Sequence, residues 1–347
     1  MSRGLTTGET LQMTEKNRQF LLAARPVGMV KESDFEYREA PVPEPHDGEV
    51  LIRTSYISLD PSMRGQMENR ADYVAPLQIG DVMRAGGVGR IVRSRNPAYA
   101  EGAQVTGTFG MQDFAVSNGR DAPFRVIDND LDPTLVLGAL GGTGMTAYFG
   151  LLELGQPKPG ETVVVSGAAG ATGSVAAQIA KIKGCRVIGM AGSQDKCRWL
   201  TDELGLDAAI NYRTDDVGAA LDRLCPGGID VYFDNVGGEI LDLCLARIAT
   251  HARVVLCGGI SRYNATGPVP GPKNYFNLVF RRARMEGFIV LDYAPRFPEA
   301  IAEMRQWIAA GQLKQQVTVI EGFRELPRAL IKLFEGYNTG KMLVKTS

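Results

Sequence analysis

The chain has 347 residues, which is long enough for two domains. Its 38 Lys and Arg nearly balance its 39 Asp and Glu, so the charge favours neither a nucleic acid nor a membrane surface as partner. No apolar run approaches the ~18 residues of a membrane span, and no signal-peptide pattern opens the chain, so we expect a cytoplasmic protein.

The cysteines and histidines predict neither a metal site nor a disulfide framework. The five cysteines are an odd number and none has C-x-x-C spacing, which favours a reduced protein over a zinc lobe. The two histidines, His46 and His251, have no other metal-ligating side chains near them in the sequence.

The first part of the chain predicts a β-rich domain. Residues 1–16 are polar and lack periodicity, so we expect a poorly ordered extension there. From residue 20 to residue 124, short alternating strands are separated by Pro and Gly, most clearly at 49–57 and 87–93.

A different pattern begins near residue 134. A helix over 137–154, interrupted by a glycine turn at 141–144, leads into strands that alternate with helices. We expect strands that begin at 162 and that cover 186–190, 208–211, 229–234, 253–257 and 285–291. We expect the intervening helices at 194–204, 215–224, 239–248 and 274–282. This α/β order with right-handed crossovers predicts a doubly wound parallel sheet, the Rossmann fold.

The last part of the chain returns to strand-like segments, at 315–320 and 341–345, around one helix. These segments most simply rejoin the β-rich domain. We therefore predict an extension at 1–16, a discontinuous β-rich domain at 17–143 and 311–347, and a Rossmann domain at 144–310.

The most informative motif is a glycine-rich turn between the first strand and the first helix of the Rossmann domain. Here Gly170, Ala171, Thr172 and Gly173 would meet a dinucleotide pyrophosphate, because the glycines allow close backbone approach and the helix N-terminus offers free N–H groups. Ala168 stands where the usual G-x-G-x-x-G has its first glycine. An ordinary structural loop is therefore an equally good interpretation of this motif taken alone.

The end of the second strand of this domain bears on the choice of dinucleotide. An acidic residue there would bind the ribose 2′-OH of NAD, but Ala191 and Gly192 occupy the strand end and Lys196 follows. We favour NADP(H), whose 2′-phosphate needs a cation. The alternative is that Lys196 is an exposed residue of the first helical turn and that Asp195 beside it only caps the helix.

Several motifs in a characteristic order carry a family resemblance. They are 59–65 (Leu-Asp-Pro-Ser-Met-Arg-Gly), 144–150 (Gly-Met-Thr-Ala-Tyr-Phe-Gly), 166–174, 233–239 (Phe-Asp-Asn-Val-Gly-Gly-Glu), 259–264, 286–290 and 333–341. On these motifs, the chain from residue 20 onward resembles the zinc-independent medium-chain dehydrogenases/reductases of the prostaglandin reductase, leukotriene B4 12-hydroxydehydrogenase and 2-alkenal (curcumin-type) reductase group. The resemblance implies a GroES-like catalytic domain beside the Rossmann domain, NADP(H) as cofactor and a homodimer.

The resemblance also implies roles for single residues. Lys196 and Tyr212 would bind the 2′-phosphate, and Thr146 would lie beside the nicotinamide. The remaining cofactor contacts would come from Asn235, Cys257, Gly258, Gly259, Ile260, Ser261, Tyr263, Phe288, Ile289, Val290 and Asn338. For the two asparagines, turn formation next to glycine is an alternative, and 288–290 is also expected to be a buried strand.

The implied chemistry is reduction of an electron-poor C=C bond in an α,β-unsaturated aldehyde or ketone. The cysteine that would bind catalytic zinc near 55–60 is missing. Charge that collects on an enolate oxygen needs only hydrogen-bond donors. Tyr263 is the expected donor, and the resemblance implies that its hydroxyl acts together with the nicotinamide ribose 2′-OH of the cofactor, either holding the substrate carbonyl oxygen or relaying a proton. Tyr73 matches a second pocket tyrosine of the group. That Tyr73 is only an ordinary packing residue is an equally good interpretation.

Three other functions remain open. A quinone reductase shares the scaffold and needs no metal, and an NADPH-binding protein without catalytic role would keep the same cofactor motifs. Oxidation of an allylic alcohol is a minor alternative. The chain has Ser62 where many relatives have an aromatic residue, and Gly142 and Thr143 where some have Met-Pro, so the substrate itself is not predicted.

Overall fold

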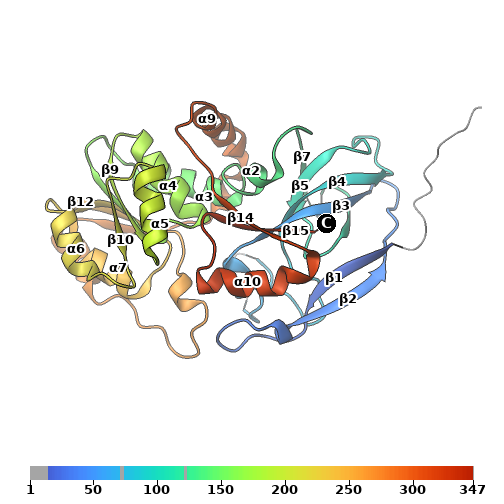
Figure 1. Cartoon of the computed structure of the whole chain (residues 1–347), viewed down its shortest axis with the longest axis horizontal. Coiled ribbons are helices and arrows are strands. Elements are labelled where there is room, and N and C mark those ends of the chain that lie inside the picture. Colours follow the sequence, from blue (N-terminus) through green and yellow to red (C-terminus); the bar gives the residue numbers. More distant parts are fainter. Residues whose placement is uncertain (1–14, 71–73, 121–122, 347) are drawn as a thin grey trace, which may run out of the picture.

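The computed structural model describes residues 15–70, 74–120 and 123–346. They form two lobes side by side (Figure 1). We call them the β lobe, which holds strands β1–β7, β14 and β15, and the α/β lobe, which holds β8–β13. Within these residues, no helix has the length and apolar character needed to cross a membrane.

The β lobe is built on a sheet in the order β14-β15-β3-β4-β5-β7, with β6 paired to β3, and on a separate β1-β2 pair. Its strands are β1 (Lys16–Leu22), β2 (Phe35–Pro41), β3 (Val50–Leu59), β4 (Gly86–Ser94), β5 (Gln104–Thr108), β6 (Phe114–Ser117), β7 (Phe124–Ile127), β14 (Val317–Glu321) and β15 (Lys341–Lys345). The β-rich domain expected for the first part of the chain is therefore present. Strand β1 already begins at Lys16, the last residue that we assigned to the extension.

The α/β lobe contains a parallel sheet in the order β10-β9-β8-β11-β12-β13, which confirms the predicted doubly wound fold. Its strands are β8 (Thr162–Val165), β9 (Arg186–Ala191), β10 (Ala208–Asn211), β11 (Ile229–Asp234), β12 (Ile248–Leu256) and β13 (Arg284–Gly287). The chain order reverses between β8 and β11, and ligands bind at the carboxyl ends of strands at such a switch point.

Helices cover both faces of this sheet. Val163 and Val165 of β8 pack in one apolar cluster with α3, α4 and α9, whereas Val164 between them packs in another with α6 and α7. A strand buried on both faces has to be apolar throughout, as β8 is. The helices are α1 (Ser62–Gln66), α2 (Pro133–Leu137), α3 (Gly142–Phe149), α4 (Ala171–Ile182), α5 (Gln194–Arg198), α6 (Val217–Leu224), α7 (Gly238–Leu245), α8 (Asn277–Phe280), α9 (Phe297–Ala309) and α10 (Leu326–Glu335).

The helix expected over 137–154 is divided. Helix α2 ends where the helix was expected to start, and α3 begins at Gly142, inside the expected glycine turn. Gly150–Gly155 then continues α3 as a π-helical turn. A Cβ on Gly144 would lie 1.6 Å from the Ala139 carbonyl oxygen, so only glycine permits this tight return of the chain.

Two expected elements near the sheet edge are shorter than predicted. The last strand, β13, ends at Gly287 instead of residue 291, and a 3-10 turn starts at Val290. The helix expected over 274–282 consists of the 3-10 turn Asn274–Phe276 and the four residues of α8. Among the described residues, β13 is an edge strand that pairs with β12 alone, so one neighbour determines where it ends.

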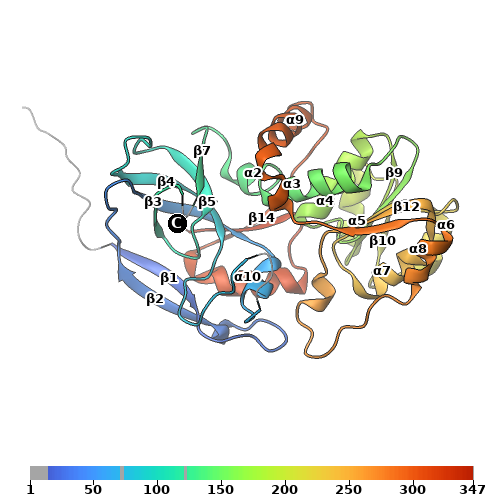
Figure 2. The same ribbon diagram turned by 180° about the vertical axis from the view of Figure 1, so that it is seen from behind.

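Helix α9 was not predicted, although its apolar residues have helical spacing. Ala300, Met304 and Trp307 follow one another by four and three positions and are buried in the cluster that contains α3 and α4. After α9 the chain returns to the β lobe by way of β14 (Figure 2), and β15 then pairs with β3. This return agrees with a discontinuous β-rich domain, while the exact domain limits stay a prediction.

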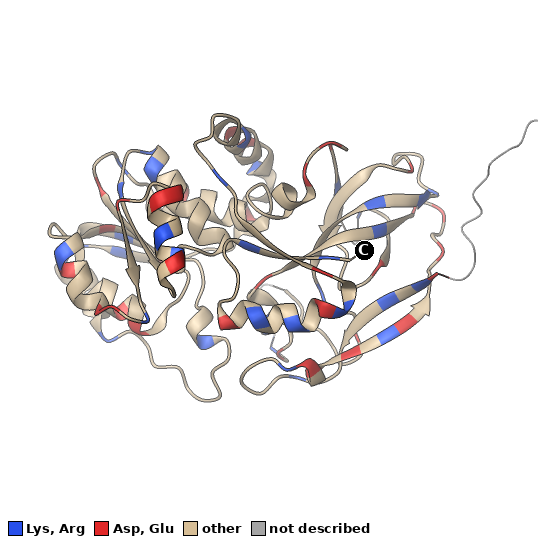
Figure 3. Cartoon of the chain, viewed as in Figure 1, with Lys and Arg blue, Asp and Glu red and all other residues tan. Residues whose placement is uncertain are grey.

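Basic and acidic residues are interspersed along the chain in both lobes, for example along β1 and β2 (Figure 3). This distribution matches the near balance of charges in the composition.

Candidate active site

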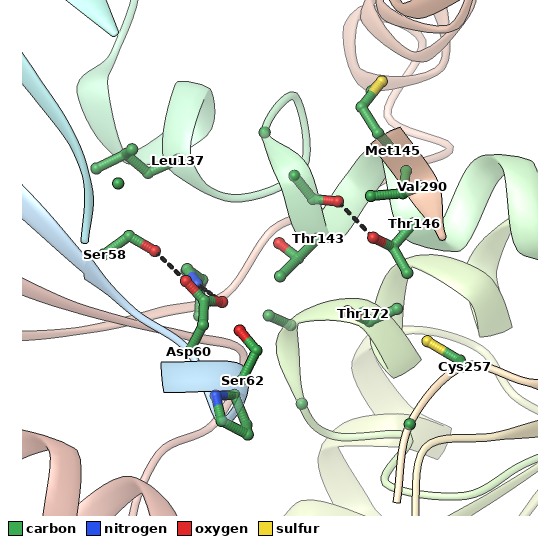
Figure 4. Close-up of a pocket in the computed structure, with 18 of the residues that line it drawn as sticks. Ser58, Asp60, Ser62, Leu137, Thr143, Met145, Thr146, Thr172, Cys257 and Val290 are labelled. Atoms are coloured by element: carbon green, nitrogen blue, oxygen red, sulfur yellow. Dashed lines mark hydrogen bonds and ion pairs between the residues drawn. The ribbon is translucent and has the colours of Figure 1, made fainter. Parts of the chain in front are cut away.

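A cleft of about 1310 Å³ lies between the two lobes and is lined by both. Figure 4 shows Ser58, Asp60 and Ser62 of the β lobe on one side, facing Thr143 and Thr172 of the α/β lobe on the other. The cleft contains the carboxyl ends of the central parallel strands, where the switch point was expected to bind a ligand.

The glycine-rich turn forms one wall of the cleft. Gly167 takes a φ of +58°, so it supplies the tight turn for which Ala168 is unsuited. A Cβ on Gly173 would lie 2.3 Å from the Gly167 carbonyl oxygen, so glycine is required for α4 to pack against the turn. Gly170 precedes α4, and no side chain caps that helix. The free N–H groups of its first turn can therefore bind an anion.

The end of β11 is fixed by the buried carboxylate of Asp234. One of its oxygens accepts hydrogen bonds from the Ser166 hydroxyl at 2.9 Å and from the backbone N–H groups of Val236 and Gly237. The Asn235 amide donates to the Ser166 carbonyl oxygen at 2.7 Å. This network holds the turn after β11 against the glycine-rich turn after β8.

The end of β9 carries the residues expected to bind a 2′-phosphate. Lys196 and Tyr212 both line the cleft next to Ala191 and Gly192. The Lys196 ammonium donates to the Gly336 carbonyl oxygen at 2.6 Å, a contact between the lobes. Of the residues that the structure describes, none with an acidic side chain lines the cleft at this end.

Tyr263 lies in the loop after β12, just beyond a 3-10 turn over Ile260–Arg262. Its hydroxyl accepts a long hydrogen bond, 3.5 Å, from the Gly259 backbone N–H and lies in the cleft wall. Burial raises the pKa of Tyr263 above its ordinary value, and the smaller effect of the Gly259 contact does not cancel this. The phenol therefore keeps its proton at neutral pH and can act as a hydrogen-bond donor.

A buried ion pair lies on the β-lobe side of the cleft. The Lys341 ammonium contacts Asp60 and donates to the Leu59 carbonyl oxygen at 3.1 Å, while the Ser58 hydroxyl donates to Asp60 at 2.6 Å (Figure 4). Burial alone would raise the pKa of Asp60, but Lys341 and the Ser58 hydroxyl hold it below its ordinary value. This part of the cleft thus holds two charges that neutralise each other.

Threonines of α3 contribute uncharged groups to the same region. The Thr146 hydroxyl donates to the Gly142 carbonyl oxygen at 2.7 Å, and the Thr143 hydroxyl donates to the Gly138 carbonyl oxygen at 3.2 Å. In Figure 4, Thr146 lies near Val290. Because each hydroxyl donates its proton to a backbone carbonyl oxygen, its own oxygen can accept a hydrogen bond from a ligand.

Most of the residues singled out in the sequence come together in this cleft. Those that line it are Thr146, Gly170, Ala171, Thr172, Gly173, Lys196, Tyr212, Asn235, Cys257, Gly258, Ile260, Tyr263, Phe288, Ile289, Val290 and Asn338. Gly259 and Ser261 do not line it, and the Ser261 hydroxyl donates instead to the Val236 carbonyl oxygen. Tyr73 lies outside the described residues.

The two asparagines use their amides within the protein. Besides the Asn235 contact, the Asn338 amide donates to the Gly340 carbonyl oxygen at 2.7 Å. The alternative of turn formation is therefore part of their role, and their assigned contacts to a cofactor stay a prediction.

The sequence did not identify the Asp60–Lys341 pair as part of the site. The two residues are 281 positions apart, and the pairing of β15 with β3 brings them together. Both lie in motifs of the family resemblance, which was the one available signal. Within residues 15–70, 74–120 and 123–346, no three or more His, Cys, Asp or Glu side chains are grouped to hold a metal ion.

Comparison with known proteins identifies the family. Residues 18–124 match the model described as the N-terminal domain of oxidoreductase, and residues 171–308 match that described as zinc-binding dehydrogenase. The NADPH-dependent curcumin reductase of Escherichia coli is 41% identical over 341 residues, which cover 97% of this chain and 99% of the relative. The chain belongs to the medium-chain dehydrogenase/reductase family.

Two other members of this family support the same grouping. The NADP⁺-dependent 2-alkenal reductase of Nicotiana tabacum is 38% identical over 337 residues, covering 95% of this chain and 98% of the relative. The crystal structure of CurA from Vibrio vulnificus in complex with NADPH has a TM-score of 0.90 and 42% identity, covering 95% of this chain and 99% of that one. The expected family and its group of curcumin and alkenal reductases are thus confirmed.

Proposed function

We propose that this reductase uses NADPH to reduce the C=C bond of α,β-unsaturated aldehydes and ketones. The observation that carries the proposal is the protonated phenol of Tyr263 in the wall of a cleft that also contains the glycine-rich turn. The relatives named curcumin reductase and 2-alkenal reductase support the substrate class.

NADP(H) fits the residues present. The uncapped N-terminus of α4 suits the pyrophosphate, and the end of β9 offers Lys196 in place of the carboxylate that would select NAD. When bound, NADPH supplies the hydride that reaches the β-carbon of the substrate.

The protein has to stabilise charge on the substrate carbonyl oxygen. As the β-carbon becomes saturated, negative charge collects on this oxygen, and the Tyr263 hydroxyl donates a hydrogen bond to it. The Gly259 N–H donates to the same hydroxyl oxygen, which leaves the phenolic proton free for the substrate. Such a donor acts mainly on charge that develops in the transition state. A proton from solvent water then adds to the α-carbon, which balances the hydride and completes the reduction.

The residues on the substrate side of the cleft support a preference for particular substrates within this class. Ser62, Gly142 and Thr143, where the chain differs from relatives, all line the cleft. Small side chains at these positions leave room for a bulky or branched substrate.

The test measures NADPH oxidation with 2-alkenals, enones and quinones, for the wild type and for Tyr263→Phe. We expect enals and enones to be turned over, and kcat in the variant to fall about 100-fold, the scale of one lost oxyanion donor, with NADPH affinity unchanged. Tyr275→Phe is the control, because Tyr275 is 56% exposed and outside the cleft wall.

Other outcomes would redirect the assignment. Fast turnover of quinones alone would make the protein a quinone reductase. NADPH binding without turnover of any acceptor would favour a non-catalytic binding protein, and unchanged enone kinetics in Tyr263→Phe would remove this residue from the mechanism.

We also propose a homodimer joined at the edge of the parallel sheet. Strand β13 is the edge strand, and the preceding segment exposes Phe276, Val279 and Phe280, each more than half accessible. Exposed apolar side chains beside an unpaired strand edge are typical of an interface. Light scattering of the wild type should give twice the chain mass, and Phe280→Glu should shift it toward the monomer; a monomeric wild type would contradict the proposal.

A further inference from the structure

The carboxyl end of β9 holds two cations without an acidic partner. Among the described residues, neither Lys196 nor Arg213 forms an ion pair with a carboxylate. Asp195, next to Lys196 in the chain, is paired with Arg198. Asp215, two positions after Arg213, accepts hydrogen bonds from the Asn211 N–H and the Thr214 hydroxyl. Two cations left without a counter-ion are the arrangement expected of an anion-binding site.

Arg213 lies over the position that selects the dinucleotide. A Cβ built on Gly192 would come within 3.3 Å of the Arg213 Nε and within 2.5 Å of the Tyr212 hydroxyl. Both side chains therefore fill the space above Gly192, immediately after β9. This is where a carboxylate would bind the ribose 2′-OH of NAD.

The two cations also influence each other. Burial lowers the pKa of Lys196, and the positive charge of Arg213 lowers it further. A dianionic phosphate between them would offset both effects, because it would stabilise the charged form of the lysine.

The other lobe holds these cations in place at the carboxyl end of α10. Lys196 donates to the Gly336 carbonyl oxygen, and Arg213 donates to the Glu335 carbonyl oxygen at 3.5 Å. The C-terminus of a helix carries partial negative charge, which favours cations there. The Arg213 contact is at the long limit of a hydrogen bond, so its guanidinium keeps donors for another partner.

We propose that Arg213 is a specificity-determining residue that binds the 2′-phosphate of NADPH together with Lys196. The inference rests on the cofactor given under the proposed function and does not depend on the substrate. A guanidinium can bind two phosphate oxygens at once, which the compact ammonium of Lys196 cannot do.

The test uses calorimetric titration with 2′,5′-ADP and with 5′-AMP, which differ in the 2′-phosphate alone. We expect Arg213→Ala to bind 2′,5′-ADP about tenfold more weakly, the scale of one charge-assisted hydrogen bond in an exposed site, and to bind 5′-AMP as the wild type does. Arg198→Ala is the matched control, because Arg198 is an exposed arginine of the same lobe that pairs with Asp195.

Each outcome decides a different point. An unchanged affinity of Arg213→Ala for 2′,5′-ADP, or an equal loss for both nucleotides, would overturn the role of Arg213. A wild type that binds 5′-AMP as tightly as 2′,5′-ADP would instead overturn the choice of NADPH in the proposed function. Partial recovery of the affinity for 2′,5′-ADP in Arg213→Lys would show that the positive charge at this position contributes to binding the 2′-phosphate.

Discussion

Lys196 and Lys341 both line the cleft, one beyond the carboxyl end of β9 and the other in β15. The side chain of Lys341 is 3% exposed and paired with Asp60. Lys196 is half-buried, has a carbonyl oxygen as its hydrogen-bond partner, and has Arg213 as its charged neighbour. The same residue type is thus neutralised at one end of the cleft and left without a counter-ion at the other.

The difference separates two uses of a positive charge. A lysine that is buried against a carboxylate contributes to the fold and adds no net charge to its part of the cleft. A lysine that lacks an acidic partner remains available to an anionic ligand. Variants of each end should therefore affect different properties, namely stability at Lys341 and cofactor preference at Lys196.

The largest effect is expected for Lys341→Met. Removing the ammonium leaves Asp60 as a buried charge without its partner, and the free energy of unfolding should fall by about 3 kcal/mol. Urea denaturation measures this loss. Lys345→Met is the control, because Lys345 is 40% exposed and lies 4.0 Å from Glu321; it should cost less than about 0.5 kcal/mol. Equal free energies of unfolding for the two variants would show that the buried Asp60–Lys341 pair stabilises the protein no more than the exposed Lys345 does.

Lys196→Ala should leave stability nearly unchanged and alter cofactor preference. The ratio of kcat/KM for NADPH to that for NADH should fall about 30-fold, because one charged contact to the 2′-phosphate is worth roughly 2 kcal/mol. Lys181→Ala serves as control, since Lys181 forms a surface ion pair with Asp207 outside the cleft. A loss of activity with NADH as large as the loss with NADPH would contradict a phosphate-specific role.

Acid should weaken the Asp60–Lys341 pair. The folded-state pKa of Asp60 is below its ordinary value, because Lys341 and Ser58 outweigh the effect of burial. Its contribution to stability is therefore complete above the unfolded-state pKa of about 3.9 and is lost as the pH falls through the folded-state pKa. The stability difference between the wild type and Asp60→Asn should shrink in this acid range; a difference that is constant with pH would show that the charge of Asp60 is not involved.

Gly192→Ala should have the smallest effect. The added methyl group would displace the flexible end of Tyr212, whose hydroxyl lies 2.5 Å from the position that the new carbon would take. We expect NADPH binding about threefold weaker, with NADH binding unchanged. Gly227→Ala is the control, because a Cβ there meets nothing within 4 Å. Unaltered NADPH affinity in Gly192→Ala would mean that Tyr212 makes no contact with the 2′-phosphate.

The parallel sheet could be predicted from the sequence because its signals are local. The apolar run of β8 and the glycines that follow it lie within a dozen residues and have few alternative conformations. The end of β13 could not be predicted, since in the described part of the chain it is an edge strand whose extent depends on its pairing with β12. Helix α9 could have been found from the spacing of Ala300, Met304 and Trp307.

The candidate site divides in the same way. The turn at Gly170 and Gly173 could be predicted from the sequence, because the backbone conformation of such a turn determines the residue type. The Asp60–Lys341 pair depends on the register of β15 against β3, and the position of Arg213 depends on the packing of two lobes. No local pattern encodes either arrangement.

The position of β15 also affects the order in which the protein can fold during synthesis. The α/β lobe is built from consecutive strands, so its sheet can be completed once β13 has left the ribosome. In the β lobe, β3 is made early, but its neighbour β15 is translated only after the whole α/β lobe. Until then residues 56–59 of β3, which pair with β15, have an unpaired edge, which makes the nascent β lobe prone to aggregation. The lobe that is synthesised first is therefore completed last.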